Sequence, residues 1–325
     1  MPGERLFDIA ARFETPIREA FLSAVSQIKE QTDLEELEQQ LRENGLAGAT
    51  AFFQNLQVNQ VFTAAMAIPL QEAISASGRL AFSFIPGPAV VNEAFVFNPL
   101  VRESAEAIRN YELDLIQQVS NNTRAAVRNA VEADIISGRN PRETARTFRE
   151  TIGLTPRQEQ AVRNYRRALE QLDPVALQRK LRDRRFDGSV RRAINESRPL
   201  PQDQIDRAVQ RYRERYIRHR SEVIARTESL RAISIGNHQA NLQMIAQGSI
   251  DPEMVRRFWI FTRDERTRAA HRRIPGLNPG GVRLDQPFVT PLGPLLFPRD
   301  PNGSAQNTVQ CRCTIVIRLV NPEEA

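Results

Sequence analysis

The sequence contains very little cysteine, lysine, tryptophan and histidine. Of its 325 residues two are cysteines, one is a tryptophan and three are histidines, and the only lysines are Lys29 and Lys180. A single residue separates Cys311 from Cys313, so these cysteines cannot form the disulfide framework of a small secreted domain. The other 43 of the 45 cationic side chains are arginines. Arginine suits phosphate and buried carboxylate contacts, but a GC-rich genome biases codons the same way, and composition leaves both explanations open.

Long uninterrupted hydrophobic runs are also missing. The first 20 residues alternate charged with apolar side chains and lack the apolar core of a signal peptide. The most apolar stretch, residues 80–101, contains three prolines together with polar residues that would leave unpaired backbone groups in lipid. We therefore expect neither a signal peptide nor a membrane span.

The net charge of +6 results from cancellation between segments of opposite sign. Residues 1–138 carry 10 basic and 18 acidic side chains, residues 139–226 carry 23 and 12, and residues 227–325 carry 12 and 9. A segment with a net charge of +11 attracts polyanions whatever its fold. The middle of the chain is therefore the candidate polyanion-binding region.

Helical periodicity dominates the first 250 residues. Apolar residues recur at helical spacing over 6–44, with Pro16 predicted at a helix start (N1) after Thr15 and an end at Asn44–Gly45. A buried apolar helix over 49–77 follows. An extended connector over 84–99 and a helix over 99–137 follow. Shorter helices are predicted from Asn140–Pro141, from Thr155–Pro156 and over 174–186. One long helix over 201–246 would span about 69 Å at 1.5 Å per residue.

The chain changes character after this long helix. Residues 257–262 and 308–320 have strand patterns. Apolar side chains alternate with polar ones over 308–320, which predicts one buried face for that strand. The fold class is therefore α+β, mainly α-helical, with a long central helix and a small C-terminal α+β domain. We divide the chain into an acidic and apolar helical part (1–138), an arginine-rich helical middle (139–200), and the long helix with the C-terminal domain (201–325).

The segment 211–220 combines arginines with two tyrosines. Tyrosines beside arginines can stack on bases, but Tyr212 and Tyr216 are four residues apart on the apolar stripe of the long helix, so we favour a core position for both. The arginines of this segment could pair with Glu214 and Glu222 on a solvated face. We favour polyanion binding for them, because the segment around them has a net charge of +11.

Cys311 and Cys313 could bind a metal together with His271, since alternate residues of a strand point the same way. The spacing is no standard zinc signature and a fourth ligand is not obvious, with His238 and Asp300 the remaining options. Buried thiols more often pack as small hydrophobic groups. We therefore predict no metal and no cofactor, and keep His271, Cys311 and Cys313 as the candidate ligands.

Residues 264–271 place a carboxylate, arginines and a histidine within two turns. Asp264 and His271 could act as an acid and base pair. Alternatively, Asp264 caps a helix and pairs with Arg268, while His271 docks that helix on the sheet. Because no nucleophile elbow, phosphate-binding loop or metalloprotease motif accompanies these residues, we predict no catalytic residues.

From Ile224 onward, the order and spacing of several motifs resemble the Mu F-like phage head morphogenesis (minor head protein) family. The resemblance covers about a third of the chain. The matching residues are Ala225-Arg226-Thr227-Glu228, Asn237, Asn241, Trp259, Asp264-x-Arg266-Thr267-Arg268-x-x-His271, Gly276, Phe288, Gly293, Pro298-Arg299-Asp300-Pro301 and Cys311-Arg312-Cys313.

This resemblance implies a structural minor capsid protein of a tailed phage rather than an enzyme. The expected partners are the portal protein or the major capsid protein, together with double-stranded DNA bound without sequence specificity, and we expect several copies per virion. The expected location is the head interior or portal vertex, after assembly in the bacterial cytoplasm, with a role in genome ejection also open. The arginines expected to face DNA are Arg163, Arg166, Arg167, Arg184, Arg185, Arg191, Arg192, Arg211, Arg213, Arg215, Arg218 and Arg220.

Two alternatives remain open at this point. One is a metal-dependent hydrolase or nuclease acting at His271, Asp264, Cys311 and Cys313. The other is a transient assembly factor that is absent from mature virions.

Overall fold

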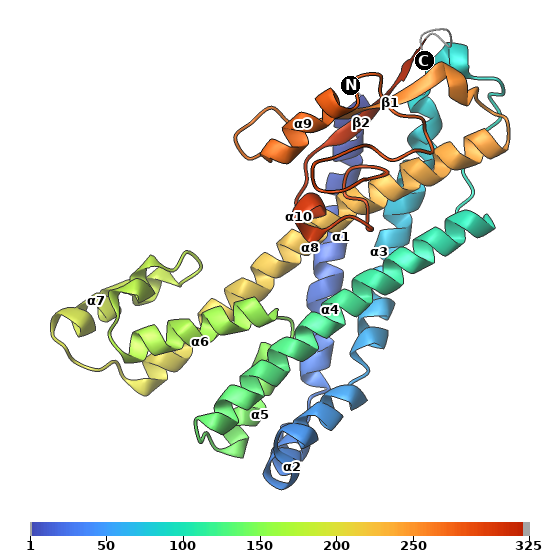
Figure 1. Cartoon of the computed structure of the whole chain (residues 1–325). Coiled ribbons are helices and arrows are strands. Elements are labelled where there is room, and N and C mark those ends of the chain that lie inside the picture. Colours follow the sequence, from blue (N-terminus) through green and yellow to red (C-terminus); the bar gives the residue numbers. More distant parts are fainter. Residues whose placement is uncertain (1, 321–325) are drawn as a thin grey trace. The chain divides into compact units, whose positions relative to one another are not determined.

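The computed structural model describes residues 2–320 and shows a mainly helical chain with one small antiparallel sheet (Figure 1). This confirms the predicted fold class, a long central helix followed by a small C-terminal α+β region. The outer ends of the first and third predicted parts, Met1 and residues 321–325, lie outside the described residues. The helices are α1 (Pro2–Glu30), α2 (Leu34–Asn55), α3 (Val58–Ala81), α4 (Arg102–Ile136), α5 (Pro141–Thr151), α6 (Pro156–Glu170), α7 (Asp187–Asn195), α8 (Gln202–Ala246), α9 (Ala269–Leu277) and α10 (Ala305–Thr308), and the strands are β1 (Val255–Ile260) and β2 (Thr314–Leu319).

Helix starts and stops in the middle of the chain follow local sequence signals. The side chain of Asn140 accepts a hydrogen bond from the Glu143 backbone at 2.9 Å, which caps α5. Thr155 and Gln158 form a reciprocal capping box at the start of α6. Helix α8 runs for 45 residues and is followed by Gly248 with a positive φ of 65°. The predicted long helix is therefore confirmed.

Several local predictions were wrong. The helices predicted over 6–44 and 49–77 are interrupted at residues 31–33 and 56–57. Pro16 lies inside α1 rather than in a first turn, next to the fully buried Ile17. Residues 174–186 form two short 3₁₀ turns, because Asp173 and Asp183 each accept a hydrogen bond from the backbone two residues ahead. Strand β2 begins only at Thr314, since the residues before it bond to side chains rather than to a neighbouring strand.

The described residues form two compact units. The first comprises residues 2–19, 66–113 and 223–320, and the second comprises residues 20–65 and 114–222. Each unit combines segments that are far apart in the sequence, whereas the sequence analysis divides the chain at residues 138 and 200. That each of those three parts is a domain stays a prediction.

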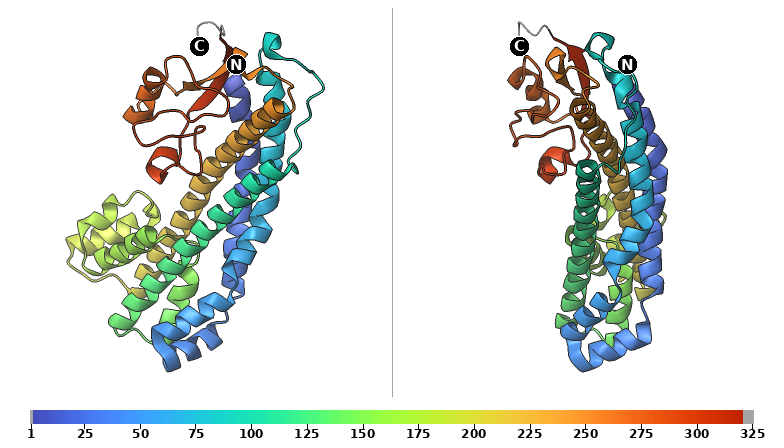
Figure 2. Two further views of the ribbon diagram at one scale, coloured as in Figure 1. Left: turned by 45° about the vertical axis from the view of Figure 1, so that its right-hand side comes forward. Right: turned by 90° about the vertical axis from the view of Figure 1, so that its right-hand side faces the viewer.

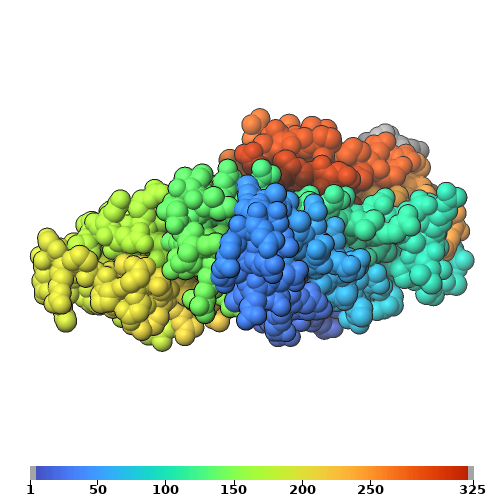
Figure 3. Space-filling view, turned by 90° about the horizontal axis from the view of Figure 1, so that it is seen from below, coloured from blue at the N-terminus to red at the C-terminus, as the bar shows by residue number. Residues whose placement is uncertain are grey.

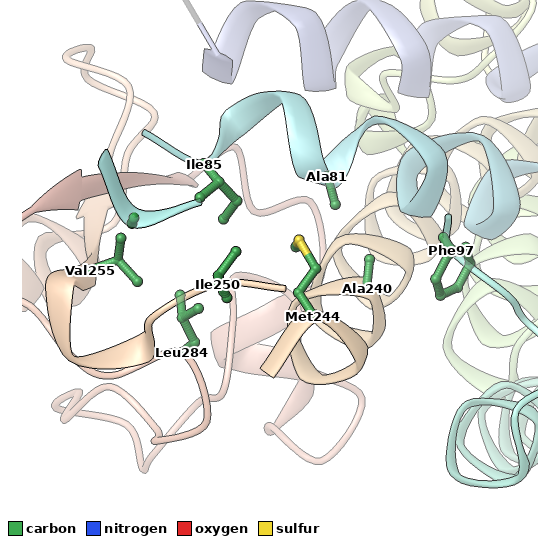
Figure 4. Close-up of a cluster of buried hydrophobic side chains, with 9 residues drawn as sticks. Ala81, Ile85, Phe97, Ala240, Met244, Ile250, Val255 and Leu284 are labelled. Atoms are coloured by element: carbon green, nitrogen blue, oxygen red, sulfur yellow. The ribbon is translucent and has the colours of Figure 1, made fainter. Parts of the chain in front are cut away.

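The first unit has a core between the end of α3 and the end of α8. Ala81 and Ile85 face Ala240 and Met244 of α8, with Phe97 closing the cluster (Figure 4). Helices α3 and α8 approach closely at Gly236, where an added Cβ would lie 2.1 Å from the Ile74 carbonyl oxygen. A glycine at this position therefore permits the helix contact.

A second cluster of the first unit lies in the C-terminal region. Strands β1 and β2 pair antiparallel, with Trp259 opposite Ile315, and α9 contacts β1. In both views of Figure 2, the segment from β1 to β2 lies beside the second half of α8. The buried members of the cluster are Trp259, Ile274, Phe288, Leu295, Cys311 and Cys313.

The second unit is built around aromatic pairs. Phe21 stacks on Phe62 with ring centroids 5.6 Å apart, and Tyr165 contacts Tyr212 at 4.4 Å. Tyr212 is buried, which confirms its predicted core position, while Tyr216 is half-buried against it. The segment from α6 to the first turns of α8 reaches the surface seen in Figure 3, yellow-green to yellow. None of the helices among residues 2–320 is both long and apolar enough to cross a bilayer.

Candidate functional site

The C-terminal region brings His271, Cys311 and Cys313 into one buried cluster. His271 lies in α9, and both cysteines lie in the segment between α10 and β2. The Nδ1 atom of His271 is 3.5 Å from the Cys311 sulfur and 3.3 Å from the Cys313 sulfur. All three side chains are about 1% exposed. The sequence motif named these three residues, and the structure shows that they meet, although the cysteines precede the strand on which they were expected.

Neighbouring side chains orient the ring of His271. Its Nε2 lies 2.8 Å from Oδ1 of Asn307, and the Nδ2 group of Asn307 donates to Thr290 Oγ1 at 3.2 Å. Thr290 donates its own hydroxyl hydrogen to the Gly293 carbonyl, so its oxygen accepts from Asn307. Oδ1 of Asn307 is therefore an acceptor and Nε2 of His271 a donor. In the neutral ring this leaves the Nδ1 lone pair directed at the two sulfurs.

A buried arginine holds the backbone that carries both cysteines. Nη1 of Arg299 donates to the carbonyl oxygens of Cys311 and Cys313 at 3.0 and 2.7 Å. Arg299 is 4% exposed and has a positive φ of 69°. None of the ion pairs within residues 2–320 includes it, and burial lowers its pKa while the two thiols oppose that shift. Its positive charge therefore faces the thiols without a carboxylate to balance it.

Glu228, which belongs to the family motif on α8, helps to hold the backbone of Arg299 in place through Arg231. Glu228 forms a buried ion pair with Arg231 at 2.9 Å and accepts a hydrogen bond from Tyr111 at 2.8 Å. Arg231 also donates to the carbonyl of Arg299 at 2.9 Å. Burial raises the pKa of the Tyr111 hydroxyl, and the Glu228 charge adds to that shift. This part of the motif therefore stabilises the fold around the cluster.

Two further motif residues have different surroundings. Oγ1 of Thr227 accepts a hydrogen bond from the Gln310 backbone at 3.3 Å, next to the cysteine segment. Arg226 is exposed on α8. Thr227 therefore supports the same loop, whereas no contact explains Arg226.

Arg257 in β1 organises the irregular loop that follows α9. Its guanidinium donates to the carbonyls of Arg283 at 3.1 Å and Leu296 at 2.6 Å and also to that of Gln286, and it lies over the ring of Phe288. The side chain is fully buried, and this burial lowers its pKa to about 10. The sequence pattern placed Arg257 at the start of a strand but did not indicate that its side chain is buried.

The structure contradicts both pairs considered for Asp264, the acid and base pair with His271 and the ion pair with Arg268. Its carboxylate bonds to Arg312, with Oδ2 2.6 Å from Nη1, and this hydrogen bond lowers the pKa of Asp264 to about 2. Arg268 donates to the Val309 carbonyl at 2.5 Å instead of pairing with Asp264. Arg266 is exposed, with its guanidinium 3.8 Å from Asp264. Because Asp264 is not part of the His271 cluster, it cannot serve there as the partner of an acid and base pair.

The cluster without a metal has the chemistry of a thiol–imidazole group. A hydrogen bond from Cys313 and the contact with His271 lower the pKa of the Cys311 thiol, although burial opposes this. The pKa of Cys313 is raised by its bond to Cys311 and by burial. Burial tends to lower the pKa of His271, but the hydrogen bond and charge of Cys311 together with the bond to Asn307 outweigh it, and the net shift is upward. A thiolate on Cys311 and a positive charge on His271 therefore stabilise each other in the bare cluster.

His238 and Asp300, the other metal ligands considered from the sequence, lie outside this cluster. His238 packs against Phe297 with ring centroids 5.1 Å apart. Burial lowers its pKa to about 3, so the ring is neutral. Asp300 accepts backbone hydrogen bonds from Leu296 and Asn302 and caps a turn.

The arginines predicted to face DNA all lie in the second unit, but they differ in exposure. Arg220 is 6% exposed, donates to the Gly153 carbonyl at 2.9 Å and lies over the Phe21 ring. Burial lowers its pKa to about 10. The prediction was therefore wrong for Arg220, which supports the core. Arg213 is half-buried near Glu150 and Glu159, and burial lowers its pKa as well.

Six other members of the predicted set pair with carboxylates, with Arg163 and Arg166 half-buried and the other four exposed. Arg163 bonds to Glu159 at 3.0 Å, and Arg166 contacts Asp206 at 2.5 Å. Arg185 and Arg215 share Asp183. Arg191 approaches Asp187 and Arg211 pairs with Glu214. Four exposed members take part in no ion pair among the described residues, namely Arg167, Arg184, Arg192 and Arg218.

A groove lined mainly by residues of α5, α6 and α8 is not suited to bind phosphate groups. It is lined by four arginines and by four carboxylates, so its charges balance. Two of the predicted residues, Arg166 and Arg213, lie in it. The free cationic charge of the second unit therefore resides on exposed side chains rather than in this groove.

Sequence reasoning missed Arg231, Arg257 and Asn307 as residues that build the C-terminal site. Arg299 was noticed only as part of a motif.

Residues 189–316 match the family model of phage Mu protein F-like proteins. This match extends further toward the N-terminus than the resemblance seen from Ile224 and includes most of α7, all of α8 and the whole His271 cluster. Comparison with curated proteins and with solved structures finds no match.

Proposed function

We propose, from the phage Mu protein F-like domain at residues 189–316, that the chain is a structural minor head protein of a tailed phage. The domain match is the single observation that carries this proposal. The protein acts in head morphogenesis, is present in several copies in the head interior or at the portal vertex, and has no catalytic role. Its domain fits such a role because buried arginine contacts give it a rigid, loop-rich surface.

Within this role, the second unit contacts packaged double-stranded DNA. Residues 139–226 carry 23 basic and 12 acidic side chains, and four exposed arginines there have no carboxylate partner among the described residues. Guanidinium groups of this kind bind phosphate oxygens without reading the base sequence. Arg167, Arg184, Arg192 and Arg218 are the members we expect to contribute most.

The acidic and apolar residues 1–138 are the part proposed to dock on the portal or the inner capsid. The connector between η2 (Gly87–Ala89) and α4 exposes Val91, Val96 and Leu100, which are 69%, 74% and 83% exposed. Exposed apolar side chains close together along a loop are typical of protein contact surfaces. These three side chains support a protein partner for this part of the chain.

Mass spectrometry of purified virions tests the structural role. A virion component is expected at a constant copy number per major capsid protein in DNA-filled particles. A chain that occurs in immature heads and is absent from filled particles is a transient assembly factor instead.

The DNA contact is tested by the salt dependence of binding to a long duplex. Log affinity is expected to fall linearly with log salt. Changing all four unpaired arginines to Gln should reduce the slope by up to about 4, because each neutralised phosphate contributes about one to it. A matched control removes the same charge from the first unit by changing Arg79, Arg109, Arg263 and Arg273, which are all exposed. A flat salt dependence, or equal effects of the two quadruple variants, contradicts the proposed DNA surface.

A further inference from the structure

We propose that His271, Cys311 and Cys313 bind one zinc ion, which closes the C-terminal part of the domain. The proposal concerns these residues themselves and does not depend on the head-protein role. In the described part of the chain they are the His, Cys, Asp and Glu side chains that come together as possible ligands, with all ligand atoms within 4.8 Å of one another. Imidazole and thiolate are the ligands that zinc prefers in proteins.

The distances match those of a tetrahedral zinc site. With Zn–S bonds of about 2.3 Å and Zn–N bonds of about 2.0–2.1 Å, a tetrahedral angle separates nitrogen from sulfur by about 3.5 Å. The two observed separations from His271 Nδ1 are 3.5 Å to Cys311 and 3.3 Å to Cys313. One ion can therefore contact all three atoms with little movement of the side chains.

The ring of His271 is already arranged as in a metal site. Ligating histidines almost always donate their second ring N–H to an acceptor, which fixes the tautomer and the orientation of the ring. Asn307 supplies that acceptor at 2.8 Å, and Thr290 fixes the orientation of the Asn307 amide. The Nδ1 lone pair is thereby held toward the sulfurs, where the ion would lie.

Nearby donors stabilise the two thiolates that zinc would require. Arg299 is buried without a carboxylate partner among residues 2–320 and binds the backbone carbonyls of both cysteines. Trp259 packs edge-on to His271 at 5.9 Å, and its buried indole N–H is directed at the Cys313 sulfur. A buried positive charge and an N–H donor beside the sulfurs fit anionic thiolates better than neutral thiols.

The segment between β1 and β2 has little regular structure and a small core, which indicates that a bound metal would stabilise it. Between β1 and β2 the chain contains only α9 and the four-residue α10, and the rest is irregular loop. The local buried cluster has six members, of which two are the cysteines themselves. A region with so small a core commonly requires a metal or disulfides for stability. An ion bound here ties α9 to the segment that enters β2, and its three protein ligands leave a fourth position for water.

The test measures metal in the purified full-length chain. Expression in zinc-supplemented medium and purification without chelator should yield one zinc per chain by elemental mass spectrometry. After removal of zinc by a chelator, anaerobic titration with Co²⁺ should produce the absorption of a thiolate-to-cobalt charge transfer. Cys311→Ser, Cys313→Ser and His271→Gln should each lose most of the bound metal, whereas His219→Gln, an exposed histidine of α8, should keep it.

Two further variants keep the test informative where a ligand variant fails to fold. His271→Cys replaces one ligand by another, so it should still bind Co²⁺ but with stronger charge-transfer absorption. Asn307→Ala removes only the acceptor behind the ring and should weaken metal affinity about 10- to 100-fold.

A wild-type chain that is helical by circular dichroism but binds neither Zn²⁺ nor Co²⁺ overturns the proposal. So does metal content that persists at wild-type affinity when both cysteines are serines. A metal-free chain with one thiol reactive at neutral pH would instead identify the cluster as a thiolate–imidazolium pair.

Discussion

Glu159 of α6 is expected to make the stability of the second unit depend on pH. Its side chain is 3% exposed, and although Arg163 lies 3.0 Å away, burial raises the carboxyl pKa from 4.5 to about 7. The folded chain therefore binds this proton more tightly than the unfolded chain does. The resulting stability is fully present below pH 4.5 and is lost as the pH rises through 7.

The magnitude follows from the two pKa values. At 1.36 kcal/mol per pKa unit, the contribution of Glu159 to the free energy of unfolding falls by about 2.5 kcal/mol between pH 5 and pH 8. Glu159→Gln has the same shape and no charge. It should therefore raise the free energy of unfolding by about 1 kcal/mol at pH 5 and by about 3 kcal/mol at pH 8, measured against the wild type.

Urea denaturation followed by circular dichroism at several pH values measures this difference, and hydrogen exchange of the α6 amides assigns it to the second unit. Glu196→Gln, at an exposed glutamate just after α7, controls for the loss of one negative charge. If the difference between Glu159→Gln and wild type does not grow from pH 5 to pH 8, the carboxylate is solvated and the reasoning from burial is refuted.

Three substitutions test the packing and the hydrogen bonds of the fold. Gly236→Ala should lower the free energy of unfolding by about 1–3 kcal/mol or more, because its Cβ would meet the α3 backbone at 2.1 Å. Gly188→Ala, which meets nothing within 4 Å, should be neutral or stabilising in the same chemical denaturation. Arg257→Lys should lower it by about 3 kcal/mol, since one ammonium cannot satisfy three separate carbonyls, and Trp259 fluorescence reports the loss locally. Thr155→Ala removes the capping box of α6 and should lower the unfolding free energy by about 1 kcal/mol, while Thr155→Ser should retain it.

The structure adds a third explanation for the abundance of arginine. Arg257 and Arg299 lie in the C-terminal region of the first unit, and Arg220 lies in the second. Each is buried and donates to two or more backbone carbonyls. Lysine cannot make these contacts, since its ammonium is a single point and arginine has five donors in a planar fork. Part of the arginine content therefore replaces the backbone hydrogen bonds that irregular loops lack.

Several features could be predicted because their causes are local in the sequence. The capping box at Thr155, the break at Gly138 and the 45-residue α8 depend on residues within one or two helical turns. The core position of Tyr212 follows from helical periodicity. In contrast, the position of Pro16 inside α1 was predicted wrongly, because its neighbours Ile17 and Phe21 are both fully buried and tertiary packing outweighs the local preference of proline.

By itself, the sequence determined the helical class, the long α8, the basic middle and the residue types His271, Cys311 and Cys313. These depend on periodicity, composition and motifs, which need no knowledge of distant contacts. Only the tertiary structure decided which arginines remain exposed and which, like Arg220, are buried. It also decided that Asp264 pairs with Arg312 and that His271 meets two sulfurs held by Arg299. The partners in these contacts are 14 to 48 residues apart in the chain, and local sequence patterns carry no information on pairing across such separations.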